Sequence, residues 1–183
     1  MKEILSSVSK EYLRVVKEDF KKYKSLGDKT FSQLNEEEFH FRSDEENNSI
    51  AIIIQHLSGN MHSRFSNFLS TDGEKTSRNR DSEFEEQNLS KDELLQKWNS
   101  GWEVMINALN SLRPDDLTKT VMIRNEPHSV IEALNRQVTH YAYHVGQIVL
   151  LAKQLKKSGW KTLSVPKGGS EKFNKEKFEQ GNK

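Results

Sequence analysis

Four segments of the chain carry apolar residues at intervals of three and four, and this spacing constrains the fold more than any other feature. The segments span residues 4–23, 50–69, 94–112 and 131–155. Apolar side chains with this period form one stripe along an α-helix, which must be buried against other helices. Because 30% of the residues are charged and only 33% are hydrophobic, the opposite helix faces are expected to meet solvent. The sequence therefore predicts an all-α protein built as a four-helix bundle.

Local signals predict where these helices begin and end. Ser49 precedes the second segment and is a typical N-cap. Ser90 and Ser129 each lie three residues before a glutamate, which is the spacing of a capping box at the start of the third and fourth helices. Glycine favours helix termination, so Gly27 and Gly159 are the expected ends of the first and fourth helices.

The connections between the helices are long. Residues 28–46 show no clear period, and we expect one helical turn near residues 36–38. Residues 70–89 are almost wholly polar, and a loop of this length is usually functional or mobile. Residues 118–129 combine an alternating β-branched run with a turn, which predicts a short β-hairpin arm before the fourth helix.

The expected organisation is one bundle domain followed by a tail. Residues 1–159 contain the four helical segments and form the expected bundle, whereas residues 160–183 are a polar C-terminal tail. We expect this tail to pack partly on the bundle, and residues 160–165 and 173–174 are its two pieces of interest. Most of its other residues are charged, so we expect them to be frayed.

Composition narrows the classes of function. The absence of cysteine excludes disulfides, thiolate metal sites and a cysteine nucleophile. A net charge of +1 argues against nucleic acid as the main partner. The longest apolar runs, such as residues 50–54, are too short to span a membrane. The N-terminus has no apolar signal-peptide core, so the expected location is the cytoplasm.

Histidines on two of the predicted helices carry the strongest functional signal. His140 and His144 are four residues apart, which makes them neighbours on one helix face. A helical wheel places His56 on the same flank of the second helix, so the three imidazoles are able to converge on one metal ion. Three histidines with an open fourth position are typical of catalytic zinc sites. Imidazole suits several divalent metals, so zinc, nickel, iron and manganese are not distinguished. The alternative is that these histidines are partly buried and bonded only to protein groups.

Four further polar residues are candidates for supporting roles. Asn60 lies one turn after His56 and Gln147 lies three residues after His144. Either side chain is placed to hydrogen-bond a ligating imidazole or the substrate, or to serve as an ordinary polar helix residue. Arg78 and Arg80 in the long loop are expected either to meet an anionic substrate or to be solvated loop charges.

The same residues carry a resemblance to a known family. Residues 48–60, which include His56, and the pattern His-x-x-x-His-x-Gly-Gln at residues 140–147 resemble the DinB-like superfamily. Residues 68–81 and 164–174 are similar to an uncharacterised bacterial branch of it. The resemblance covers nearly the whole chain. It implies a four-helix bundle that is often dimeric and a divalent metal on three histidines, which map here onto His56, His140 and His144.

The resemblance leaves two functions open. Characterised relatives include transferases and isomerases that use low-molecular-weight thiols such as bacillithiol or mycothiol, whereas others have no known activity. One hypothesis is therefore a metal-dependent enzyme that activates such a thiol or water for transfer or hydrolysis on a small-molecule substrate. The other is a non-catalytic, dimeric helical binding module. Both hypotheses include a homodimer.

Overall fold

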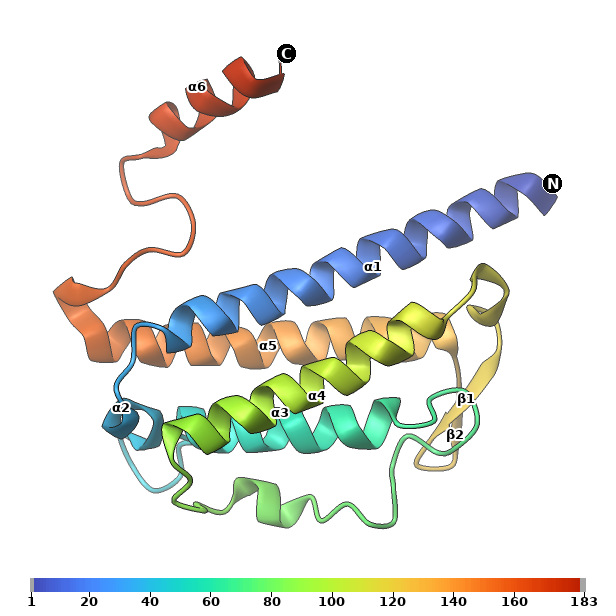
Figure 1. Ribbon diagram of the computed structural model, residues 1–183, viewed down its shortest axis with the longest axis horizontal. Helices are drawn as coiled ribbons and strands as arrows, with labels where there is room; N and C mark the ends of the chain where they lie inside the picture. Colours follow the sequence, from blue (N-terminus) through green and yellow to red (C-terminus); the bar gives the residue numbers. More distant parts are fainter. Residues whose placement is uncertain (1, 182–183) are drawn as a thin grey trace.

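Four long helices lie side by side in the computed structural model, which describes residues 2–181 and the side chains of residues 7–180 (Figure 1). Helix α3 packs most extensively on α4, and α1 packs on α5, while α3 and α5 also touch. The prediction of an all-α bundle is confirmed. The four helices are α1 (Lys2–Phe31), α3 (Ile50–Phe65), α4 (Lys91–Ser111) and α5 (Val130–Lys156).

Shorter elements occupy the connections. The predicted helical turn is α2, and the predicted hairpin is the antiparallel pair β1–β2, in which Thr120 is opposite Ser129. Arg124 and Asn125 form its two-residue turn, and both have the positive φ of the turns that favour hairpins. The short elements are α2 (Glu36–His40), η1 (Asp81–Phe84), η2 (Pro114–Asp116), β1 (Thr120–Ile123), β2 (Glu126–Ser129), η3 (Lys157–Gly159) and α6 (Ser170–Gly181).

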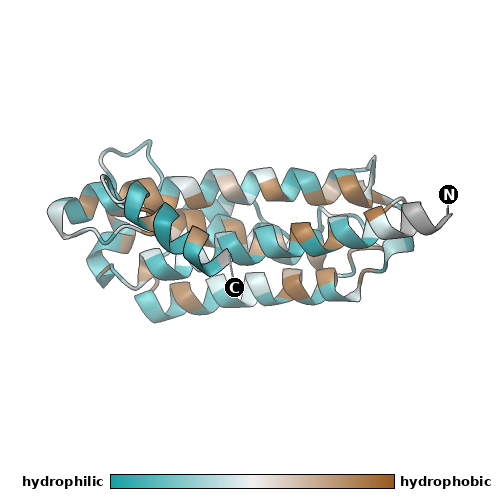
Figure 2. Ribbon diagram, turned by 90° about the horizontal axis from the view of Figure 1, so that it is seen from above, coloured by the Kyte–Doolittle hydropathy of each residue, from teal (hydrophilic) through white to brown (hydrophobic). Residues whose placement is uncertain are grey.

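Aromatic side chains connect three of the long helices through the core. Phe31 of α1 meets Trp98 of α4 edge-on, with ring centroids 5.1 Å apart. Trp98 then contacts Trp102, and Trp102 contacts Tyr141 of α5. All four residues are buried. Each long helix carries both apolar and polar residues along its length (Figure 2). Because Tyr141 is held in the core, the rotation of α5 about its axis is fixed and its neighbours His140 and His144 turn toward α3.

The predicted N-cap signals are confirmed, but three helix ends differ from prediction. Helix α5 ends at Lys156, and the positive φ after it, 48°, belongs to Lys157 and not to Gly159. Helix α1 continues past Gly27 to Phe31, because Gly27 is buried against Trp98 with no space for a Cβ atom. This glycine is a packing residue and not a helix stop. Helix α3 ends at Phe65, before the predicted residue 69, and Asn67 follows in the left-handed region with φ 52°. Ser49 caps α3, while Ser90 and Ser129 form complete capping boxes.

The C-terminal segment has two parts. Trp160 packs against the core, and Gln33 exchanges two hydrogen bonds with the backbone of Lys161. The expectation that the charged end is frayed is wrong, because Ser170–Gly181 form the helix α6, which extends away from the bundle (Figure 1). Within residues 2–181, no helix has both the length and the apolar character that crossing a bilayer requires.

Candidate metal centre

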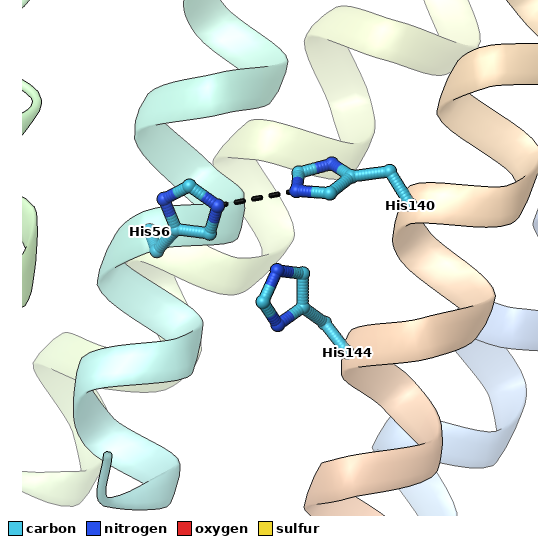
Figure 3. A group of neighbouring side chains, drawn as sticks. All are labelled: His56, His140 and His144. Atoms are coloured by element: carbon cyan, nitrogen blue, oxygen red, sulfur yellow. Dashed lines mark hydrogen bonds between the residues drawn. The ribbon is translucent and has the colours of Figure 1, made fainter. Parts of the chain in front are cut away.

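Three histidines meet between α3 and α5. His56 comes from α3, and His140 and His144 come from successive turns of α5 (Figure 3). One ring nitrogen from each residue lies within 4.8 Å of the other two. The Nε2 atoms of His56 and His140 are 3.2 Å apart. The packing of the two helices thus brings together all three residues that the sequence nominated as metal ligands.

Polar neighbours orient two of the three imidazoles. Nδ1 of His56 lies 2.9 Å from Oε2 of Glu83, and Nδ1 of His144 lies 2.8 Å from Oε1 of Gln147. Both partner atoms are acceptors, so each Nδ1 donates a hydrogen bond, and in a neutral imidazole this leaves the lone pair on Nε2. Metal-ligating histidines usually have such a partner, which fixes the tautomer and the ring orientation.

The buried environment keeps the imidazoles of His140 and His144 neutral. Burial, together with the smaller effects of the neighbouring His144 and His56, lowers the pKa of His140 to about 3. Burial likewise lowers the pKa of His144 to about 4, with a smaller effect of His56. Both imidazoles are therefore uncharged at neutral pH, with one N–H and one free lone pair each. This is the form of histidine that binds a metal ion.

Glu83 was not anticipated as part of this site. It lies in η1, within the long polar loop, and its carboxylate accepts from Nε of Arg78 at 2.7 Å and from Nη2 at 2.8 Å. Burial raises the pKa of Glu83, but Arg78 and His56 outweigh that effect and hold the pKa below its usual value. Glu83 therefore remains a carboxylate in contact with His56. No spacing rule identifies it, because it is 27 residues away from His56 in the sequence.

A chain of buried ion pairs extends from Glu83. Arg78 also approaches Glu74, with 3.3 Å between Nη1 and Oε1, and Arg64 of α3 pairs with Glu74 at 3.0 Å. The expectation of a solvated Arg78 is wrong, since its side chain is only 5% exposed. These pairs hold the loop of residues 70–89 against α3, so this segment forms one wall of the site.

Asn60, the other polar residue proposed to support the site, bonds to a tyrosine, whereas Gln147 bonds to a histidine. Its Oδ1 accepts a hydrogen bond from the hydroxyl of Tyr141 at 3.0 Å, and both residues are buried. Asn60 thus ties α3 to α5 one turn from His56. The ring of Tyr141 packs in the aromatic core, against Trp102.

A cavity of about 580 Å³ adjoins the three histidines. Phe84 packs on the His56 ring with centroids 4.7 Å apart, and the Arg80 guanidinium lies over Phe84 at 4.9 Å. The half-buried imidazole of His140 is on the cavity wall. The lining residues are His56, Asn60, Arg64, Arg78, Arg80, Phe84, Arg124, Arg136, Gln137, Thr139, His140, Tyr143 and His144.

A family model with the description "Protein of unknown function (DUF1572)" matches residues 7–169. The chain belongs to this family. The match covers α1 from residue 7 onward, the other three long helices, the hairpin, the three histidines and Glu83. A comparison with curated proteins finds no match. The wider resemblance to the DinB-like superfamily stays a prediction.

Two of the three other histidines of this DUF1572 domain, His62 and His128, lie apart from the centre. His62 is on α3, where its Nε2 lies 3.1 Å from the hydroxyl of Ser100 on α4. His128 is in β2. Neither residue lines the cavity beside the three-histidine cluster.

Proposed function

We propose that this protein is a metal-dependent enzyme that holds one divalent cation on His56, His140 and His144 and acts on a small molecule. The observation that carries the proposal is the convergence of three imidazoles on the wall of a cavity. Three neutral nitrogen ligands with one open position are the donor set of catalytic zinc sites. Zinc, nickel, iron and manganese all remain candidates, because imidazole binds several of these metals.

The donor atoms fit a cation of this kind. Two nitrogens that each bind at about 2.1 Å in a tetrahedral arrangement lie about 3.4 Å apart. The separation of 3.2 Å between the Nε2 atoms of His56 and His140 is close to this value. The orientation of His56 by Glu83 and of His144 by Gln147 further supports the fit.

The residues of the site then have distinct tasks. A divalent cation with an open position supplies Lewis acidity that lowers the pKa of a water or thiol reaching it. Glu83 holds the proton on Nδ1 of His56, and Gln147 holds the proton on Nδ1 of His144. Phe84 covers one face of the His56 ring and limits its access to water. Since the protein has no cysteine, a reacting thiol must come from a diffusible low-molecular-weight compound.

The resemblance to the DinB-like superfamily supports the finer parts of the proposal. We extend it to a low-molecular-weight thiol as the co-substrate and to a homodimer as the functional state. A binding module without catalysis is expected to close its histidines off within the protein. The position of His140 on the wall of a cavity favours an enzyme over such a module.

Metal content tests the proposal directly. Untagged protein purified without added metal is analysed by elemental mass spectrometry, beside the variants His56→Ala/His140→Ala and His62→Ala. We expect about one divalent ion per chain in the wild type and in His62→Ala. The double variant should contain none. Equal metal content in all three proteins would overturn the three-histidine site. The absence of metal, with no rise in Tm on adding zinc, nickel or manganese, would overturn it as well.

A further inference from the structure

The cavity beside the histidines has a strongly cationic wall. Five arginines line it, and no aspartate or glutamate is among the lining residues. They come from four separate parts of the fold: α3, the loop of residues 70–89, the hairpin turn and α5. Converging cations from distant segments raise the local concentration of anions in a cleft. The five residues are Arg64, Arg78, Arg80, Arg124 and Arg136.

Nearby carboxylates neutralise only part of this charge. Glu83 pairs with Arg78, and Glu74 is shared by Arg64, Arg78 and Arg124. Five guanidinium groups are thus matched by two carboxylates. In the part of the chain that the structure describes, Arg80 and Arg136 form no ion pair with a carboxylate. Both are exposed, so a molecule that enters the cavity meets their free charge first.

Two buried polar atoms in the cavity wall have no partner. Oε1 of Gln137 and Nε of Arg64 are buried without a hydrogen bond within the described residues. Gln137 is 3% exposed and Arg64 is 5% exposed, and both residues line the cavity. Buried polar groups in folded proteins are nearly always hydrogen-bonded. Nε of Arg64 lacks an acceptor and the amide oxygen of Gln137 lacks a donor, and a molecule bound in the cavity would supply both groups.

We propose that the substrate of this site is a small organic anion with a carboxylate or phosphate group, held by Arg80, Arg136 and Arg64 beside the three histidines. This assignment rests on the proposed function, because the bound anion is a substrate only if a cation on the histidines takes part in the reaction. Guanidinium groups match carboxylate and phosphate through paired N–H donors. A hydroxyl or amino group on the same molecule would donate to Gln137.

Calorimetric titrations of the full-length protein with inorganic phosphate and with malonate test the inference. The wild type is compared with Arg80→Gln/Arg136→Gln and with Arg42→Gln/Arg113→Gln, which removes the same charge from exposed arginines outside the cavity. We expect saturable binding to the wild type and to the control. In the cavity variant, each charged contact that is lost should weaken the affinity for the probe about tenfold. The probe that binds with the higher affinity indicates whether the substrate carries a phosphate or a carboxylate group.

Two results would overturn the inference. One is binding of both probes that is weaker than about 10 mM in the wild type. The other is an equal loss of affinity in the cavity variant and the control variant.

The same titrations on His56→Ala/His140→Ala separate this inference from the proposed function. Anion binding that survives in this variant, and is lost with Arg80 and Arg136, supports the arginine site by itself. If the wild type then contains no metal, the proposed function fails while the cavity remains an anion site. A wild type that retains metal but binds neither probe retains the proposed function and overturns the anionic substrate.

Discussion

Gly59 lies directly against the carboxylate of Glu83, so closely that a Cβ atom at residue 59 would overlap Oε1 of Glu83. Gly59 is on α3, one turn beyond His56, and Glu83 is the residue that orients the His56 imidazole. The missing side chain is what allows the loop of residues 70–89 to bring its carboxylate to α3. A substitution at Gly59 therefore changes the histidine cluster without altering any of its members.

We predict that Gly59→Ala weakens metal binding by about 10- to 100-fold, the usual effect of losing a partner of a ligating histidine. The methyl group pushes Glu83 away from Nδ1 of His56. Gly146→Ala is the matched control, since a Cβ there meets nothing within 4 Å and Gly146 is also on a helix of the site. Competition with a chelator measures the affinity. Equal affinities of the two variants would contradict the role assigned to Gly59.

The variant Glu83→Gln tests the carboxylate itself. It keeps the shape of the side chain but removes the charge that pairs with Arg78 and His56. We expect the metal affinity to fall by about 10- to 100-fold. We also expect a loss of about 3 kcal/mol in the free energy of unfolding, because the buried Arg78 then retains only Glu74.

Denaturant titration and metal competition measure the two effects of Glu83→Gln separately. Glu85→Gln is the control, as residue 85 is exposed and does not line the cavity. A variant that loses stability but keeps the wild-type metal affinity would show that Glu83 only holds the loop in place.

Asp72 ties the loop of residues 70–89 to the hairpin turn. Its carboxylate accepts from the backbone N–H groups of Glu74, Arg124 and Asn125 at 2.6, 2.9 and 2.7 Å. The N–H groups of Glu74 and Asn125 are the main reason that the pKa of Asp72 is below its ordinary value of 3.8. Folding therefore favours the charged form of this carboxylate. Its contribution to stability is complete above pH 3.8 and is lost as the pH falls through the folded-state pKa.

Asp72→Asn should accordingly lower Tm at pH 7 by about 2–4 °C, which corresponds to about 1 kcal/mol. The difference from the wild type should shrink at acidic pH, where Asp72 of the wild type is protonated too. This difference in Tm is measured by thermal unfolding at a series of pH values, from pH 7 down to the lowest pH at which the protein still folds. Asp115→Asn, at an exposed position, serves as the control. A difference that is the same at every pH would exclude the charge of Asp72 as its cause.

Gly27→Ala should destabilise the bundle by about 1–3 kcal/mol. A Cβ atom at residue 27 overlaps the Trp98 ring. That ring has little freedom to move, because it packs on Phe31 and Trp102 and its Nε1 donates to Asp28 at 2.8 Å. Gly146→Ala should instead stabilise the protein by about 1 kcal/mol, because alanine favours a helix. Chemical denaturation compares the two, and stabilisation by both substitutions would contradict the close packing at Gly27.

The elements that were predicted correctly depend on neighbours in the sequence. The capping boxes at Ser90 and Ser129 join residues three apart, and the pairing of His140 with His144 follows from one turn of a helix. The errors at Gly27 and in the charged tail have another origin. A glycine that ends a helix and a glycine that admits a tryptophan look the same in the sequence, because only the partner on α4 distinguishes them.

The four amphipathic helices, the hairpin and the choice of His56, His140 and His144 as ligands were predictable from the sequence, since periodicity and residue chemistry are local properties. The orientation of His56 by Glu83 and the five arginines that line the cavity could not be predicted in this way. These residues are far apart in the chain. Their meeting depends on the rotation of α5, fixed by Tyr141 in the core, and on the close approach that Gly59 permits. Such contacts follow from packing between distant segments, which no short-range pattern encodes.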